Sequence, residues 1–221
     1  MANPIVPPLL KAIKTTDPTG DAIKNVRSQT AGAGNLFWAP GKSTADLAIV
    51  LEPEVDRLRA LEMLPLAMVA LSDCLAVLLP PQVAVQFRGS NDIIVNGGHA
   101  GSVKVALAKT SNDKMRPGSP GSHDGPDWLV LSIKIALTSP DKDIAPGVNP
   151  DVTSLDEEGW EQPDLNKFIE TYARHFLSWM AAWNDQGFAP VARAWKFKAE
   201  DQKDPDLSQV SHTAAIYESK I

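Results

Sequence analysis

The sequence predicts an α+β fold in which a mixed, largely antiparallel sheet is flanked by helices. Short apolar or alternating runs, typical of strands, occur in groups, and helical periodicity recurs only at intervals between these groups. The strict alternation of strand and helix that a doubly wound parallel sheet requires is not found in the pattern. The 221 residues, of which 43% are hydrophobic and 22% charged, suffice for one large domain with a full core.

The first fifth of the chain is expected to combine an extended arm with a helix and two strands. Proline is frequent at the start, which favours an extended backbone over a regular element. Asp17 or Thr19 is expected to cap the helix, with Pro18 at an early position where a missing N–H loses no hydrogen bond. The expected elements are an extended arm at 1–10, a helix to about residue 31, strands at 35–39 and 47–51, and a loop at 40–45 between the strands.

The strongest helical periodicity lies between Glu54 and Leu79. Leucine, valine and methionine recur there every three or four residues, and charged residues occupy the other face of the first turns. Pro65 is expected to break or kink the helix, because proline removes a hydrogen bond and its ring clashes with the preceding turn. The pattern therefore predicts a short amphipathic helix and then a buried one, which stops at Pro80.

The rest of the chain is expected to complete the sheet and to end in helices. Residues 96–98 (Asn-Gly-Gly) predict a hairpin turn. Asp164 is expected to cap a long helix that Gly187 ends. From residue 196 onward the chain is charged and weakly patterned, so it is expected to be a docked extension or disordered. The expected elements are strands at 83–87, 93–95, 102–109 and 128–137, helices at 164–185 and 191–195, and loops at 110–126 and 139–163.

Composition argues against several classes of function. The formal net charge of −6 disfavours broad nucleic-acid binding, which needs a basic surface. No apolar run reaches the roughly 20 residues that span a bilayer, and the start lacks the pattern of a signal peptide. Cys74 is expected to be a buried, inert thiol, and His99, His123, His175 and His212 have no partner at metal-ligand spacing. We therefore expect a cytoplasmic protein without nucleic-acid, membrane or tightly bound metal partners.

A polar bend, RGSND, runs from Arg88 to Asp92 between two of the expected strands. Arg88 brings a permanent positive charge to this bend. Asn91 and Asp92 have two open roles: they orient a phosphate-bound metal, or they cap the following turn as such residues commonly do. Gly97, Gly98 and Gly101 are expected to serve turns whatever the function.

These motifs, taken in order, resemble the catalytic domain of the biotin protein ligase and lipoate ligase superfamily. RGSND resembles the end of the family's KWPND, and the glycine turn after it resembles GxK(x)GG. Thr19-Gly20-Asp21 occupies the place of the family's Ser-Thr-Asn, and VTSL at 152–155 resembles its ATSL. GFAP at 187–190 with Trp195 resembles the closing GFxPI…W. The resemblance covers about residues 15–195 and implies the class II aminoacyl-tRNA synthetase and biotin synthetase fold.

The resemblance also implies an activity, ligands and a division of the chain. Members of the superfamily adenylate biotin or lipoate with ATP and transfer the acyl group to a carrier-protein lysine. Residues 1–195 would form the ligase-like domain, and 196–221 a C-terminal extension or the remnant of a small C-terminal domain. ATP, biotin or lipoate and a carrier protein are the implied partners, and the oligomeric state stays open. By position Arg88 is the catalytic candidate, and the candidates for substrate or nucleotide binding are Thr19, Asp21, Trp38, Lys42, Asn91, Asp92, Gly101 and Lys134.

The chain departs from the family pattern in its arginine loop, GRGRxGR, which binds the acyl-adenylate through arginines and backbone N–H groups. In one register QTAGAGNLFW at 29–38 matches this loop, and Ala33 and Asn35 replace the arginines. In the other, 35–39 is the preceding strand and 40–45 is a shortened loop. The second register keeps the family spacing of the next strand and helix, and both lack the arginines.

Two further departures concern the catalytic lysine and a glycine strand. Arg88 stands at the lysine position, and its planar fork differs in reach from an ammonium group. The family's GxGxN becomes Ser132, Lys134 and Ala136, which places a long side chain where glycines leave room for a ligand.

Two classes of function follow. In one, the protein is a ligase-like enzyme, and Arg88, Lys42 and Lys104 or Lys134 supply the positive charge that adenylation needs. In the other, it is a non-catalytic relative that keeps the fold and binds a small molecule or a partner. The joint loss of the loop arginines, the lysine and the glycine strand favours the second class chemically.

Overall fold

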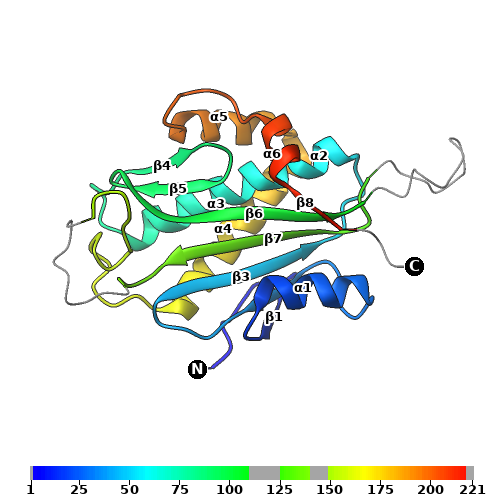
Figure 1. Cartoon of the computed structure of the whole chain (residues 1–221), viewed down its shortest axis with the longest axis horizontal. Helices are drawn as coiled ribbons and strands as arrows, with labels where there is room; N and C mark the ends of the chain where they lie inside the picture. Colours follow the sequence, from blue (N-terminus) through cyan, green and yellow to red (C-terminus); the bar gives the residue numbers. More distant parts are fainter. Residues whose placement is uncertain (1, 110–124, 140–148, 218–221) are drawn as a thin grey trace, which may run out of the picture.

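The computed structural model describes residues 2–109, 125–139 and 149–217, so most of the predicted loop at 110–126, part of the one at 139–163 and His123 lie outside the described residues. The strands are β1 (Lys11–Lys14), β2 (Asn35–Trp38), β3 (Thr44–Leu51), β4 (Val85–Arg88), β5 (Asp92–Val95), β6 (Gly98–Ala108), β7 (Leu129–Ala136) and β8 (Ala215–Tyr217). They form one sheet in the order β1-β2-β3-β7-β6-β5-β4, and β8 pairs with the end of β6 (Figure 1). Only β1–β2 and β6–β8 are parallel among these pairings, so the predicted α+β class is confirmed.

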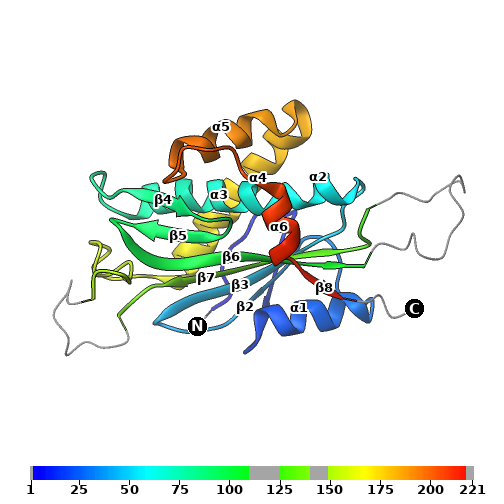
Figure 2. The same ribbon diagram turned by 45° about the horizontal axis from the view of Figure 1, so that its top comes forward.

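Helices cover the two faces of the sheet unequally. They are α1 (Pro18–Arg27), α2 (Arg57–Leu61), α3 (Met63–Leu78), α4 (Leu165–Gln186), α5 (Ala189–Lys198) and α6 (Leu207–Thr213). Helices α3, α4 and α5 lie on one side of the sheet, and α1 lies on the other side, which we call the α1 face (Figure 2). Helix α1 packs against β2, β3 and β7, at one end of that face.

Alternation along the strands sorts side chains between the two faces. On β7, Leu131 and Ile133 belong to the large core under α3 and α4, whereas Val130 belongs to a smaller core under α1. Strand β7 lies between β3 and β6 and is buried on both faces at residues 129–131, whereas Ser132, Lys134 and Ala136 on the α1 face are only partly buried or exposed. The predicted central position is therefore confirmed, and the predicted burial holds for the first part of the strand.

The predicted division of the helical region 54–79 into two helices is confirmed, but the predicted break at Pro65 was wrong. Helix α2 ends at Leu61, and Glu62 separates it from α3, whose third residue is Pro65. In the first turn of a helix a backbone N–H has no intrahelical acceptor, so proline loses no hydrogen bond there. By length and composition alone the joined stretch 57–78 would cross a bilayer, contrary to the sequence expectation, but 78% of its most apolar window is buried inside the fold.

The predicted helix caps are confirmed. Asp17 accepts a hydrogen bond from the Gly20 N–H at 3.1 Å, and Asp164 accepts one from the Lys167 N–H at 3.0 Å. Gly187 ends α4 with a φ of 72°, a left-handed conformation that favours glycine. Helix α1 ends at Arg27, earlier than the predicted residue 31, because the chain turns at once toward β2.

The segment that follows α5, as far as residue 217, is docked onto the sheet by backbone pairing. Ala199 bridges to Phe87 on the edge strand β4, and Val210 of α6 is buried. Strand β8 then pairs with β6 at Ala106–Ala108. The docked alternative is confirmed for these residues, whereas a domain boundary at residue 195 stays a prediction. Strands β1 and β8 and helix α6 were not predicted.

Candidate functional site

A row of polar side chains crosses the α1 face from β4 to β3. The strand registers pair Arg88 with Asp92, Asp92 with Ser102, Ser102 with Lys134, and Lys134 with Asp46. The neighbours of these residues along each strand, such as Phe87 and Ile133, belong to the core on the opposite side, so the row itself lies on the α1 face. At the usual strand spacing the row spans about 19 Å. We call these five residues the polar row.

Lys134 is paired with a carboxylate at one end of the polar row. Its Nζ lies 3.1 Å from Asp46 Oδ2, and the two residues are direct cross-strand partners on β7 and β3. The Lys134 side chain is 60% exposed, whereas that of Asp46 is 21% exposed. Opposite charges at such positions attract each other, so the lysine brings little net positive charge to the face.

Arg88 is paired with a carboxylate at the other end. Its Nε and Nη2 donate hydrogen bonds to the two carboxylate oxygens of Glu200, at 2.8 Å and 2.9 Å. This bidentate pair is the strong geometry for a guanidinium and a carboxylate. The hydrogen bonds to Glu200 raise the pKa of Arg88, and Asp92 and Asp151 act in the same direction. Three carboxylates therefore lie around the Arg88 guanidinium.

Asp92 and Asn91 lie beside Arg88 at the start of β5. Asp92 Oδ1 is 3.6 Å from His99 Nε2, with both side chains about two-fifths exposed. The Asn91 carbonyl accepts a hydrogen bond from the Val103 N–H at 2.9 Å, so its backbone joins β5 to β6. Within the part of the chain that the structure describes, no three His, Cys, Asp or Glu side chains gather as metal ligands would. Neither of the two roles considered for Asn91 and Asp92, orienting a phosphate-bound metal or capping the turn, is tested by these contacts, and both stay predictions.

A second polar group lies next to the row, where the start of α1 meets β7. Thr19 Oγ1 and Ser132 Oγ are 2.6 Å apart. Lys104 of β6 is the cross-strand partner of Ser132 and is exposed. It forms no ion pair with any residue in the described ranges. Lys104 is thus a cation beside two hydroxyls on the α1 face, and unlike Arg88 and Lys134 it has no carboxylate partner among these residues.

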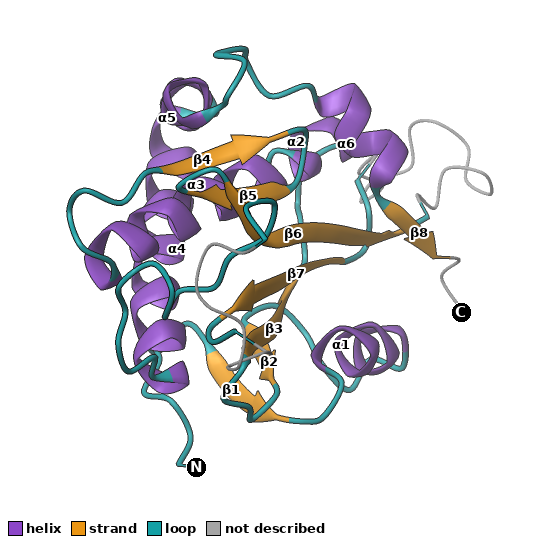
Figure 3. Ribbon diagram, turned by 60° about the vertical axis from the view of Figure 1, so that its left-hand side comes forward, coloured by secondary structure: helices purple, strands orange, loops and turns teal. Residues whose placement is uncertain are grey.

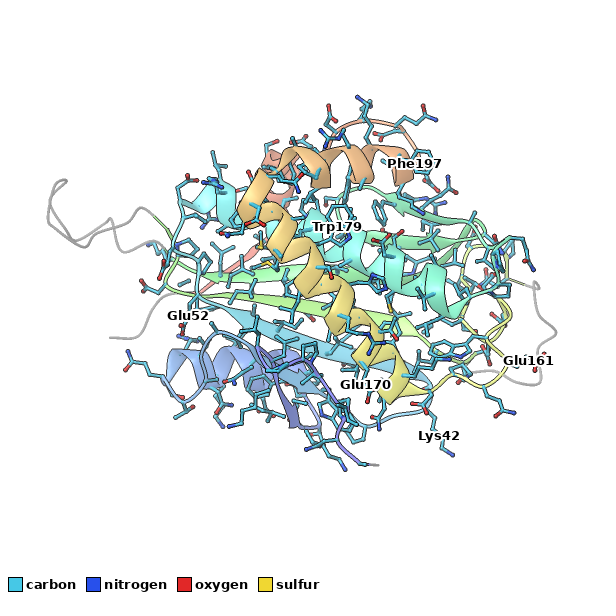
Figure 4. The ribbon with its side chains drawn as sticks, turned by 180° about the vertical axis from the view of Figure 1, so that it is seen from behind. Lys42, Glu52, Glu161, Glu170, Trp179 and Phe197 are labelled. Atoms are coloured by element: carbon cyan, nitrogen blue, oxygen red, sulfur yellow. The ribbon has the colours of Figure 1, made fainter. Side chains whose placement is uncertain are left out.

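The remaining candidates divide between this face and other places. Asp21 accepts a hydrogen bond from Thr15 Oγ1 in the first turn of α1. Lys42 is exposed in the short connection between β2 and β3 at one end of the molecule (Figure 4). Trp38 is fully buried in the core on the opposite face, so the structure does not bring it to the other candidates.

Gly101 is required by the backbone rather than by a ligand. A Cβ atom there would lie 2.0 Å from the Lys134 carbonyl oxygen. The residue also lies at the bulge where the β5–β6 register shifts between Ile93 and Ile94. Close approach of two strands therefore explains this glycine.

The structure also distinguishes the two registers considered for the arginine loop. Residues 35–38 form β2, which pairs antiparallel with β3. Only residues 39–43 connect the two strands, and the Ala39 N–H donates to the Asp46 carbonyl at 3.0 Å. This arrangement fits the shortened-loop register, in which Lys42 is the one basic residue of the connection.

Comparison with known proteins identifies the family. The model of the biotin/lipoate A/B protein ligase family matches residues 6–197.

The chain belongs to this family.

A curated biotin–[acetyl-CoA-carboxylase] ligase of Paracoccus denitrificans is 27% identical over 86% of this chain and 76% of its own length. The crystal structure of a biotin protein ligase-like protein of unknown function from Silicibacter sp. TM1040 superposes with a TM-score of 0.73. It is 28% identical and covers 89% of this chain and 81% of its own. The apo biotin protein ligase of Aquifex aeolicus shares the fold, with a TM-score of 0.65, 12% identity and coverage of 86% and 77%. The predicted ligase-superfamily resemblance and its fold are confirmed.

Some site residues of this ligase-family chain escaped the sequence analysis. Asp46 is a lone acidic residue in the apolar strand TADLAIVL, and that position was a usable sign of a polar partner. Ser102 had no such sign. Glu200 lies 112 residues from Arg88, and only the docking of the C-terminal segment brings the two together.

Proposed function

We propose that this family member binds a small carboxylic acid of the biotin or lipoate class on the α1 face and does not adenylate it. The observation that carries the proposal is the pairing of Arg88 with Glu200 and of Lys134 with Asp46. ATP carries several negative charges on its triphosphate and the acyl-adenylate one on its phosphate, and a ligase must stabilise both with free cations and N–H donors. Both candidate cations of the polar row are already paired with carboxylates, so they are not free to bind the phosphates of a nucleoside triphosphate.

A single carboxylate makes a smaller demand. One ammonium group and one or two hydroxyl donors are enough to hold it. Lys104, Ser132 and Thr19 supply that set beside one another on the α1 face. The ligand class follows from the family to which the chain belongs and from the relative named as a biotin ligase.

A second candidate is the family's full reaction, ATP-dependent transfer of biotin to a carrier protein. One observation favours it: the Paracoccus relative, at 27% identity, is named for that reaction. In that case Lys104 and Lys42 would have to receive the phosphate charge, and a biotin-carrier protein would be the partner.

Titration calorimetry with biotin and with lipoate tests the first candidate through Lys104. Lys104→Glu reverses the charge at the site and is expected to weaken binding of the acid at least about tenfold, because a favourable charge-assisted contact becomes repulsive. Lys11→Glu, an exposed lysine on the edge strand β1, is the matched control and should leave the affinity unchanged. Equal affinities for the two variants, or no binding of either acid to the unaltered protein, would overturn the proposal.

A further inference from the structure

The Arg88–Glu200 pair links the end of the polar row on β4 to the C-terminal segment after α5. Arg88 ends strand β4, and Glu200 follows α5 in the C-terminal segment. The two hydrogen bonds use Nε and Nη2, which form one edge of the guanidinium fork. A carboxylate ligand that uses this side-on edge for a bidentate contact must displace Glu200. Glu200 therefore occupies one of the two edges through which Arg88 could bind an acid bidentately.

The backbone places Glu200 independently of this ion pair. The Glu200 N–H donates to the Phe87 carbonyl at 3.0 Å, and Ala199 forms a parallel bridge with Phe87. Trp195 of α5 lies against Phe87 with ring centroids 4.8 Å apart. These contacts hold the segment at the edge of β4, so a change confined to the Glu200 side chain should leave it docked.

Two further carboxylates lie near Arg88. Asp92 and Asp151 are close enough to stabilise the charged guanidinium. An acid that takes the side-on edge of Arg88 must displace Glu200, and it meets the same repulsion from these two carboxylates that Glu200 does. The pair is still partly open to water, since the Arg88 and Glu200 side chains are 50% and 33% exposed. Exchange of one carboxylate for another on this fork is sterically possible.

We propose that Glu200 is a specificity-determining residue that blocks Arg88, so that acidic ligands of the α1 face are held without this guanidinium. The inference rests on the proposed function for the identity of the acid, but the blocking of Arg88 is independent of it. Removal of the Glu200 charge should free the fork and create a second cation for the carboxylate.

The test compares Glu200→Gln with a matched control in the same segment. Asp204→Asn is the control, because Asp204 pairs with Lys196 at 3.6 Å and does not contact Arg88. The first measurement is the rate at which phenylglyoxal modifies Arg88 in the folded full chain, followed by peptide mass spectrometry. We expect the Glu200→Gln variant to react about two- to fivefold faster and the Asp204→Asn variant to match the unaltered protein. Equal rates in all three proteins would overturn the proposal.

The second measurement is the affinity for biotin and lipoate by calorimetry. Glu200→Gln should bind the acid about two- to fivefold more tightly, and Asp204→Asn should not. Faster labelling without tighter binding, in a protein that does bind the acid, would contradict the specificity role. If labelling is faster but neither acid binds to any of the proteins, Glu200 still blocks Arg88 and the proposed function is what fails.

Discussion

The two cations of the polar row are paired with carboxylates from different parts of the chain. Lys134 pairs with Asp46, its direct neighbour on the adjacent strand, so the sheet register itself fixes the pair. Arg88 pairs with Glu200 from the far end of the chain. The register keeps Asp46 opposite Lys134 whatever the lysine rotamer, whereas Glu200 faces Arg88 only while the C-terminal segment stays docked.

Gly101, the residue before Ser102 on β6, lies where β6 and β7 approach each other closely. Gly101→Ala should lower the free energy of unfolding by about 3 kcal/mol, because the new Cβ would meet the Lys134 backbone oxygen, which cannot move without disturbing β7. Chemical denaturation measures this change. Gly41→Ala is the control: the nearest atom to its Cβ is 3.5 Å away, so its stability should stay within a few tenths of a kcal/mol. Similar losses for both variants would argue against a close strand approach at Gly101.

At the scale of elements, two indole N–H groups of α4 donate hydrogen bonds to α3 and to the junction between α2 and α3. Trp179 Nε1 donates to Asp73 on α3 at 2.8 Å, and Trp183 Nε1 donates to Glu62 at the α2–α3 junction at 2.6 Å (Figure 4 labels Trp179). Arg59 lies over the Trp183 ring, 5.1 Å from its centroid. These contacts hold α4 beside α3, which forms the opposite layer from the candidate site.

Glu62 provides a pH-dependent prediction for that junction. Burial raises the pKa of Glu62 from its ordinary value near 4.5, against the opposing effects of Trp183 and Arg59. Ionisation therefore costs more in the folded than in the unfolded state, and this residue's contribution to stability declines as the pH rises through and above 4.5. Glu62→Gln keeps the acceptor for Trp183 and should be more stable than the unaltered protein at pH 7, with a smaller difference at pH 4.

Denaturation at the two pH values measures this effect. Glu54→Gln, at an exposed position just before α2, is the control for simple removal of a surface charge. A Glu62→Gln advantage that grows toward low pH would contradict the assigned cause.

Elements with their own local cues could be predicted, and elements made by distant pairing could not. Asp17, Asp164 and Gly187 end or begin helices through contacts within a few residues, which the sequence displays. Strand β8 depends instead on the free edge of β6, about 110 residues earlier, and β1 on its pairing with β2. The break at Glu62 rather than Pro65 shows the same limit, because proline is acceptable in a first turn and so does not locate the boundary by itself.

At the scale of the whole molecule, the sheet separates a large core from an exposed face that carries polar groups. Leucine-rich α3 is buried on one side of the sheet, and α1 lies on the other (Figure 3). The end of the α1 face at β4 and β5 carries Arg88 and Asp92. The resemblance predicted Arg88, Asp92 and Lys134 as site residues one by one. Their alignment in one row with Asp46 and Ser102 required the strand registers, and the burial of Trp38 required the facing of β2.

We propose that the charge balance of this face favours acid binding over full ligase chemistry. A ligase must hold the ATP phosphates with cations that are free to do so, and Arg88 and Lys134 are both paired. Lys104 alone is suited to one carboxylate.

ATP–pyrophosphate exchange with biotin and with lipoate tests this central claim most directly, alongside an active biotin protein ligase as the reference. We predict no exchange with either acid, at protein concentrations where calorimetry detects binding of the acid. Exchange above the ATP-only background, lost in Lys104→Glu and kept in Lys11→Glu, would contradict the account and assign the family's adenylation to this chain.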